Sequence, residues 1–132
     1  MLRMLSTRIL TPKQLAMFTE NRILLEQYEA VTVTSTLKPN SWDAAALHVF
    51  TSGNAVRACF PQKGGNYPPL NCCCVGGKTA VSLEQLGHRV LEQAISASEL
   101  AQLLIEKYAK RYIYFYSGNR SLRVIPNQLL AA

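Results

Sequence analysis

One histidine and one cysteine are spaced so that they could form an activated nucleophile. His48 and Cys59 belong to two predicted strands joined at Gly53-Asn54, and counting outward from that turn places them opposite each other. An imidazole beside a thiol can act as its base. Such a site also needs a residue that orients the base and a group that stabilises an oxyanion, and the sequence identifies neither. We therefore predict no catalytic residues and a protein that is not an enzyme.

The segment VGGKT, residues 75–79, has the ending of a nucleotide-binding phosphate loop. The full pattern G-x-x-x-x-G-K-[ST] requires glycine at the position that Cys72 occupies. In addition, a helix is predicted to begin only at Leu83, not directly after the Lys-Thr pair. The sequence therefore favours a Gly-Gly turn with an exposed Lys78, with a generic nest of backbone N–H groups for an anion as the alternative. No cofactor is predicted.

Three cysteines, Cys72, Cys73 and Cys74, are adjacent in the sequence. Zinc sites favour cysteines two to four residues apart, because neighbouring side chains on a strand diverge. Only Cys72 and Cys74 could point the same way, and no nearby histidine completes a ligand set. We predict no metal site, and thiols that pack as small hydrophobic side chains.

His88 is four residues from both Glu84 and Glu92, so all three would share one face of a helix. A cluster of this kind could hold a metal, but solvated ion pairing is the ordinary interpretation. Nearby carboxylates would raise the pKa of His88 modestly.

A row of aromatic residues near the C-terminus gives the most specific predicted surface. Tyr112, Tyr114 and Tyr116 occupy alternate positions of one predicted strand, so their rings share a face. Pairing across a turn at Gly118-Asn119 places Arg123 opposite Tyr114. The predicted partner-binding residues are Tyr112, Tyr114, Tyr116, Arg120, Arg123, Lys107, Lys110 and Arg111.

These residue types are compatible with more than one kind of partner. Aromatic rings that stack on bases, beside cations that meet phosphates, form a platform for single-stranded nucleic acid. Tyrosine and arginine also dominate protein–protein hot spots. A helix or loop covering the tyrosine face is the structural alternative.

The charge of the chain favours an anionic partner. The formal net charge is +6, from 14 Lys and Arg against 8 Asp and Glu, and no acidic residue follows Glu106. We predict a small basic binding protein without catalytic activity, with nucleic acid narrowly favoured as its partner. The alternative is a protein–protein interaction module, such as an inhibitor, adaptor, chaperone or homodimer, that uses the same face.

The apolar pattern predicts a single α+β domain over residues 1–132, in the order α-β-β-β-(long loop)-α-α-β-β, with antiparallel hairpins packed against helices. A first helix begins at Thr11-Pro12 and its apolar face reaches Tyr28. Residues 30–37 read as a strand. Residues 61–81 form a loop rich in Gly, Pro and Cys, in which residues 70–75 could be a short strand. Two further helices begin at capping-box serines, Ser82 and Ser96, the first of them apolar as far as Ala94.

The stretch SGN occurs twice, at residues 52–54 and 117–119, in the contexts FTSGN and FYSGN. If both are hairpin turns, Phe50 points to the outer face of its hairpin and Phe115 to the core. A duplication should keep its core side, so we interpret the similarity as shared turn chemistry.

The N-terminal segment is too polar for a signal peptide, and no apolar run reaches the length of a membrane span. We therefore predict a cytoplasmic protein with reduced cysteines and no membrane partner. Trp42, the single tryptophan, is expected to anchor the loop before residue 46 on the core.

Overall fold

The computed structural model describes residues 1–30, 42–61, 66–118 and 123–132. Contacts within the chain divide it into two compact units, Met1–Thr34 and Ser35–Ala132. That both belong to one domain stays a prediction. The predicted strand over residues 30–37 lies outside the described residues except for Ala30.

The first unit is a βαβ element. Strand β1 (Leu2–Ser6) pairs in parallel with β2 (Ile23–Gln27), and helix α1 (Pro12–Glu20) connects them. The predicted helix start is confirmed, since Thr11 caps the helix and Pro12 takes its first position. The predicted continuation of the helix to Tyr28 is wrong. The residues after Glu20 pair with β1 instead, because a short apolar run such as Ile23 to Leu25 suits a strand as well as a helix.

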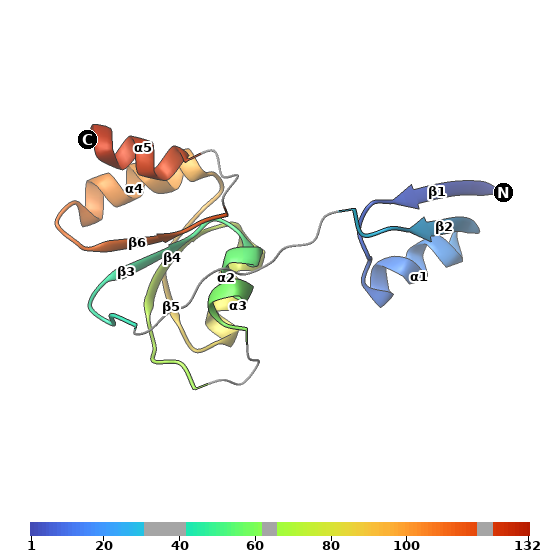
Figure 1. Ribbon diagram of the computed structural model, residues 1–132, viewed down its shortest axis with the longest axis horizontal. Helices are drawn as coiled ribbons and strands as arrows, with labels where there is room; N and C mark the ends of the chain where they lie inside the picture. Colours follow the sequence, from blue (N-terminus) through green and yellow to red (C-terminus); the bar gives the residue numbers. More distant parts are fainter. Residues whose placement is uncertain (31–41, 62–65, 119–122) are drawn as a thin grey trace. The chain divides into compact units, whose positions relative to one another are not determined.

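The second unit is a parallel sheet between two helical layers. Its elements are β3 (Leu47–Phe50), α2 (Gly53–Cys59), β4 (Asn71–Val75), α3 (Gly77–Gln85), β5 (Arg89–Ala94), α4 (Ala97–Tyr108), β6 (Ile113–Tyr116) and α5 (Val124–Ala131). The strand order is β5-β4-β3-β6. Figure 1 shows α2 and α3 on one face of this sheet and α4 and α5 on the other.

The predicted α+β fold with antiparallel hairpins is therefore wrong, because every strand pair in the described part of the chain is parallel. The segment after Ser52 is helix α2 rather than a return strand, and the Ser52 side chain accepts a hydrogen bond from the Ala55 N–H at 3.2 Å. Val56 and Cys59, three residues apart, both face the core from this helix. The second predicted return strand is likewise replaced by α5 in its described part, from Val124 onward.

The predicted helix that starts at Ser82 and reaches Ala94 is also wrong. Helix α3 already begins at Gly77, and Gly87, with φ of 86°, separates it from strand β5. The prediction of α4 is confirmed, since the Ser96 side chain accepts a hydrogen bond from the Glu99 N–H at 3.1 Å.

The core of the second unit lies on both faces of the sheet, as parallel sheets require. Cys72 and Cys74 pack toward α2 and α3, whereas Cys73 packs toward α4 and α5. All three cysteines are fully buried, so this strand is covered from both sides. The prediction that the three thiols pack as small hydrophobic side chains is confirmed. The strand predicted at residues 70–75 is confirmed as β4.

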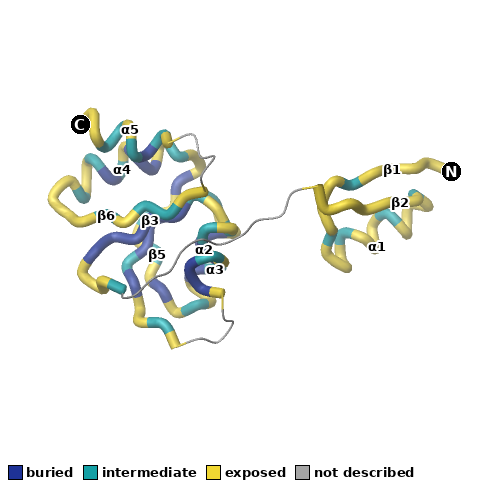
Figure 2. Tube along the Cα trace, in the orientation of Figure 1, coloured by how far each residue is buried: buried dark blue, intermediate teal, exposed yellow. Residues whose placement is uncertain are grey.

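Burial differs sharply between the two units (Figure 2). Blue segments are confined to the second unit, and none of residues 1–30 is buried. Leu5 on β1 is 67% exposed and Leu24 on β2 is 42% exposed. Across the described residues, no helix is both long and apolar enough to cross a membrane.

Candidate functional site at the carboxyl ends of the strands

Open parallel sheets bind ligands at the carboxyl ends of their strands, at the point where the connections diverge to opposite faces. In this sheet that switch point lies between β3 and β6. Strand β3 leads into α2, whereas β6 precedes α5 on the opposite face, and the two strands are neighbours in the sheet. The residues that follow β3 and β6 are therefore the first place to look for a site.

The two SGN stretches flank this switch point. Phe50 is the register partner of Tyr116, so Thr51 and Ser117 leave the sheet at the same edge. The prediction that Phe50 points away from the core is wrong, because Phe50 is fully buried in the core on one face of the sheet. Phe115 packs against the core on the other face, as expected. The interpretation of both stretches as hairpin turns is wrong, because each follows a parallel strand. Asn119 lies outside the described residues.

The turn between β4 and α3 lies at the same edge of the sheet. Gly76 is the single residue between the strand and the helix, and it has φ of 89°. No side chain in the described ranges caps helix α3, so its first backbone N–H groups point to the edge beside the exposed Lys78. The prediction that the helix begins only at Leu83 is wrong. A phosphate loop is still excluded, because one residue is too short to wrap a phosphate and Cys72 lies within the strand.

Beneath the switch point, His48 is buried with both ring nitrogens hydrogen-bonded. Its Nε2 lies 2.7 Å from the Asp43 carbonyl oxygen and its Nδ1 lies 2.9 Å from the Tyr116 hydroxyl. A carbonyl only accepts, so in the neutral ring Nε2 carries the hydrogen and Nδ1 accepts from Tyr116. The predicted placement of His48 opposite Cys59 on a hairpin is wrong, and burial raises the pKa of the Cys59 thiol to about 12. This pair is not an activated nucleophile.

His88 is buried between α3 and β5 rather than solvated on a helix. The Leu70 N–H donates to its Nδ1 at 3.3 Å, while its Nε2 has no hydrogen-bond partner among the residues that the structure describes. Burial, and to a smaller extent the charge of His48, lowers the pKa of His88. The predicted ion pairing with Glu84 and Glu92 and the predicted upward shift of the pKa are therefore wrong.

The three tyrosines of the predicted row differ in exposure. Tyr112 is 85% exposed and Tyr114 is 48% exposed, whereas Tyr116 packs against the core. Lys107 pairs with Glu92 at 2.9 Å, and Arg111 donates to the Ala45 carbonyl at 2.9 Å.

The remaining predicted binding residues are dispersed. Lys110 is exposed just before β6, Arg123 precedes α5 with φ of 54°, and Arg120 lies outside the described residues. That these eight residues bind a partner stays a prediction.

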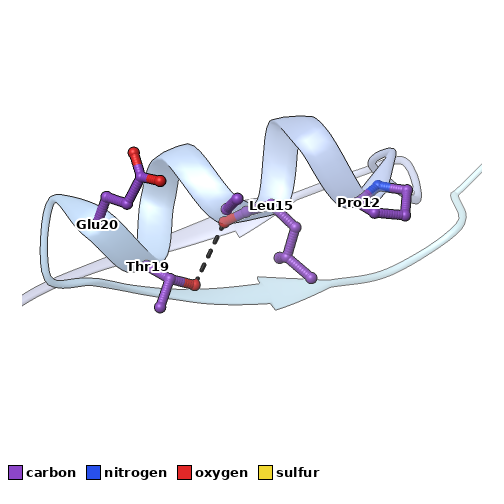
Figure 3. Close-up of a pocket in the computed structure, with 5 residues that line it drawn as sticks. Pro12, Leu15, Thr19 and Glu20 are labelled. Carbon is purple, nitrogen blue, oxygen red and sulfur yellow. Dashed lines mark hydrogen bonds between the residues drawn. The ribbon is translucent and has the colours of Figure 1, made fainter.

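Two further features carry no chemistry of their own. Burial raises the pKa of Cys72 and Cys73 to about 12, and within the described residues no group of His, Cys, Asp and Glu is arranged to hold a metal. A hollow on α1 is lined by Pro12, Leu15, Ala16, Thr19 and Glu20 (Figure 3). Because Glu20 is its one titratable group, the hollow holds no acid–base pair.

The second unit is thus a doubly wound α/β fold with a polar edge at its switch point, the class of scaffold in which ligands bind at strand ends. A family model of uroporphyrinogen-III synthase HemD matches residues 12–132, and the chain belongs to this family. The family is an enzyme family of heme biosynthesis. No curated protein and no solved structure matches the chain significantly.

The family overturns the predicted function. The prediction of a binding protein without catalytic activity, directed at nucleic acid or at another protein, is wrong, because the family is that of an enzyme. A pattern in the sequence could have indicated a parallel sheet with a ligand site. It is the repeated order of apolar strand, small polar turn and helix, as in HVFTSGNAV and CCCVGGKTA. Each turn lies where a parallel sheet places its ligand site.

Proposed function

We propose that this chain takes part in the enzymatic formation of uroporphyrinogen III and binds its ligand at the carboxyl ends of β3, β4 and β6. The observation that carries the proposal is the family match over residues 12–132. Uroporphyrinogen III is a cyclic tetrapyrrole with carboxylate side chains on its pyrrole rings. Closing that macrocycle requires an open-chain tetrapyrrole with the same carboxylates, so the ligand is an extended polyanion.

The groups at the carboxyl edge suit such a ligand. The uncapped N-terminus of α3 offers backbone N–H groups and the positive end of a helix dipole, with Lys78 in its first turn. Thr51 and Ser117 carry hydroxyl groups directly after β3 and β6. The net charge of +6 favours the approach of an anion.

The role that these groups support is binding and orientation. Ring closure joins two ends of one flexible molecule, and holding both ends in place removes much of the entropic barrier to that step. Carboxylates anchored at α3 and at the switch point would fix the ligand at more than one position. The proposal includes a cytoplasmic, reducing location, which the free and buried cysteines support.

The test measures both activity and binding. The chain is incubated with the open-chain tetrapyrrole, the products are oxidised to porphyrins, and the isomers are separated by chromatography. Formation of the III isomer above the spontaneous background is the expected result. Binding of uroporphyrin III, the oxidised product, is measured by porphyrin fluorescence.

A pair of matched variants locates the site. Lys78→Ala removes a charge at the carboxyl edge, and Lys110→Ala removes the same charge just before β6, at the amino edge of the sheet. We expect Lys78→Ala to weaken uroporphyrin binding by about fivefold, the upper end for an exposed ion pair, and Lys110→Ala to leave it unchanged. Equal effects of the two variants would contradict a site at the carboxyl edge.

A further inference from the structure

Four aromatic side chains form a continuous stack on one face of the β3–β6 pair. Tyr114 and Tyr116 of β6 alternate with His48 and Phe50 of β3, since these residues are register partners. The ring centroids are 5.4 Å apart for Tyr114 and His48, 5.9 Å for His48 and Tyr116, and 4.8 Å for Tyr116 and Phe50. The corresponding interplanar angles are 12°, 14° and 10°, so the rings are nearly parallel. The stack ends at the carboxyl edge of the sheet.

One hydrogen bond joins the two middle rings of this stack. The hydroxyl of Tyr116, the last residue of β6, bonds to Nδ1 of His48. The other ring nitrogen, Nε2, is held by the Asp43 carbonyl, so the imidazole cannot rotate to follow the tyrosine. His48 is 1% exposed, and a hydrogen bond shielded from water is stronger and more directional than one at the surface.

Strand β6 is short and lies at an edge of the sheet, so such a contact helps to hold it in place. Within the described part of the chain it is an edge strand of four residues that pairs with β3 alone. An edge strand this short is held by few backbone hydrogen bonds, and its last residue is the first to fray. Ser117 and Gly118 follow directly, and they leave the sheet at the same edge as Thr51 and Ser52.

We propose that the hydrogen bond between His48 and Tyr116 is a positioning contact, which fixes the segment after β6 relative to the segment after β3 and thereby sets the affinity of this edge for its tetrapyrrole ligand. The inference rests on the proposed function for the ligand, but the positioning itself is a property of the free protein. Neither His48 nor Tyr116 needs to touch the ligand, since both act through the residues that follow the strands.

Tyr116→Phe tests the contact with little disturbance, because it removes one hydroxyl and keeps the ring stack. Tyr108→Phe is the matched control. It also removes a tyrosine hydroxyl with one side-chain hydrogen bond, to Glu92 at 3.2 Å, but it lies at the C-terminal end of α4. Because helices run opposite to the strands in this fold, that end lies at the amino edge of the sheet.

Two measurements separate positioning from a loss of stability. Hydrogen exchange of the free protein is expected to accelerate by about fivefold at Ser117, Gly118 and Thr51 in Tyr116→Phe, the equivalent of one hydrogen bond, and not in Tyr108→Phe. Uroporphyrin III binding is expected to weaken by a similar factor in Tyr116→Phe alone. In the ¹⁵N spectrum of the wild type, His48 should show protonated Nε2 and unprotonated Nδ1.

The outcomes distinguish this inference from the proposed function. If Tyr116→Phe and Tyr108→Phe change exchange at Ser117 and Gly118 equally, the contact is merely structural and the inference is overturned. If exchange accelerates as expected while binding is unchanged, positioning by His48 stands and its role in ligand affinity is refuted. If the wild type binds no uroporphyrin, the proposed function fails, and the exchange comparison alone still decides the positioning role.

Discussion

The backbone N–H of Gly76 donates to the Ala94 carbonyl at 2.9 Å, which ties the turn after β4 to the last residue of β5. Gly76 also has φ of 89° and ψ of 144°, a conformation that is open to glycine and strongly unfavourable for other residues. The turn that exposes the N-terminus of α3 therefore depends on backbone geometry rather than on side chains.

Gly76→Ala should lower the free energy of unfolding by about 1–3 kcal/mol, because a Cβ at positive φ is strained. Apart from its two chain neighbours, no described residue would lie within 4 Å of a Cβ at Gly76, so the strain alone accounts for the loss. Gly77→Ala is the control, since its Cβ would lie an ordinary 3.5 Å from Gln93 Nε2. Denaturant unfolding of both variants provides the measurement, and equal stabilities would refute the strained turn.

Ser52→Ala should destabilise the protein by about 1 kcal/mol, the usual effect of removing a helix N-cap. The Ser52 side chain accepts from the Ala55 N–H, and without it that donor at the start of α2 loses its partner. Ser82→Ala is the comparison, because Ser82 lies within α3 and donates to the Lys78 carbonyl at an exposed position. Chemical denaturation should show a shift for Ser52→Ala and almost none for Ser82→Ala; a reversed order would contradict the capping role.

Acid should destabilise the fold through His88. Its pKa in the folded state is lowered from the ordinary value of 6.5, so the unfolded chain binds a proton first as the pH falls. The stability that neutral His88 contributes is complete above pH 6.5 and is lost as the pH falls below 6.5 toward the folded-state pKa. Protonation would also place a hydrogen on Nδ1, where the Leu70 N–H now donates.

The midpoint temperature of thermal unfolding of the wild type should fall as the pH is lowered below 6.5. In His88→Gln, which cannot titrate, the part of the slope due to His88 should disappear. A wild type and a variant with the same dependence on pH would show that His88 does not titrate between the two states.

The four cysteines should not react with thiol reagents while the protein is folded. At about pH 8, a thiol with a pKa of about 12, as for Cys72 and Cys73, is ionised in roughly one molecule in ten thousand. Burial is the main cause for both residues, and it blocks the reagent as well. Labelling with a chromogenic disulfide should therefore follow the rate of unfolding and reach all four thiols in denaturant; fast partial labelling of the native protein would contradict the buried strand.

The sequence predicted the features that local chemistry determines. The start of α1 at Thr11, the start of α4 at Ser96 and the buried strand at the cysteines are all correct, because a cap residue or an apolar run specifies each locally. Trp42 also packs as expected, stacked on Phe60 at 4.9 Å.

The errors share one physical cause. Runs such as AVRACF and RVLEQA are short, and a short apolar run suits either a helix or a strand. A strand predicted after Ser52 implies a hairpin, and a hairpin excludes the observed pairing of β3 with β6 across more than sixty intervening positions. Pairing of strands so distant in the sequence depends on tertiary packing, and the candidate site at the carboxyl edge exists only through that pairing.

The absence of buried side chains among residues 1–30 also has a calorimetric consequence. The rise in heat capacity on unfolding is proportional to the apolar surface that becomes newly hydrated. Taken by itself, the β1–α1–β2 unit hides little of that surface, so it adds residues to the chain but little to the heat-capacity step. In differential scanning calorimetry, the heat-capacity change on unfolding would therefore come mainly from the second unit, and it would be smaller than expected for a protein of 132 residues.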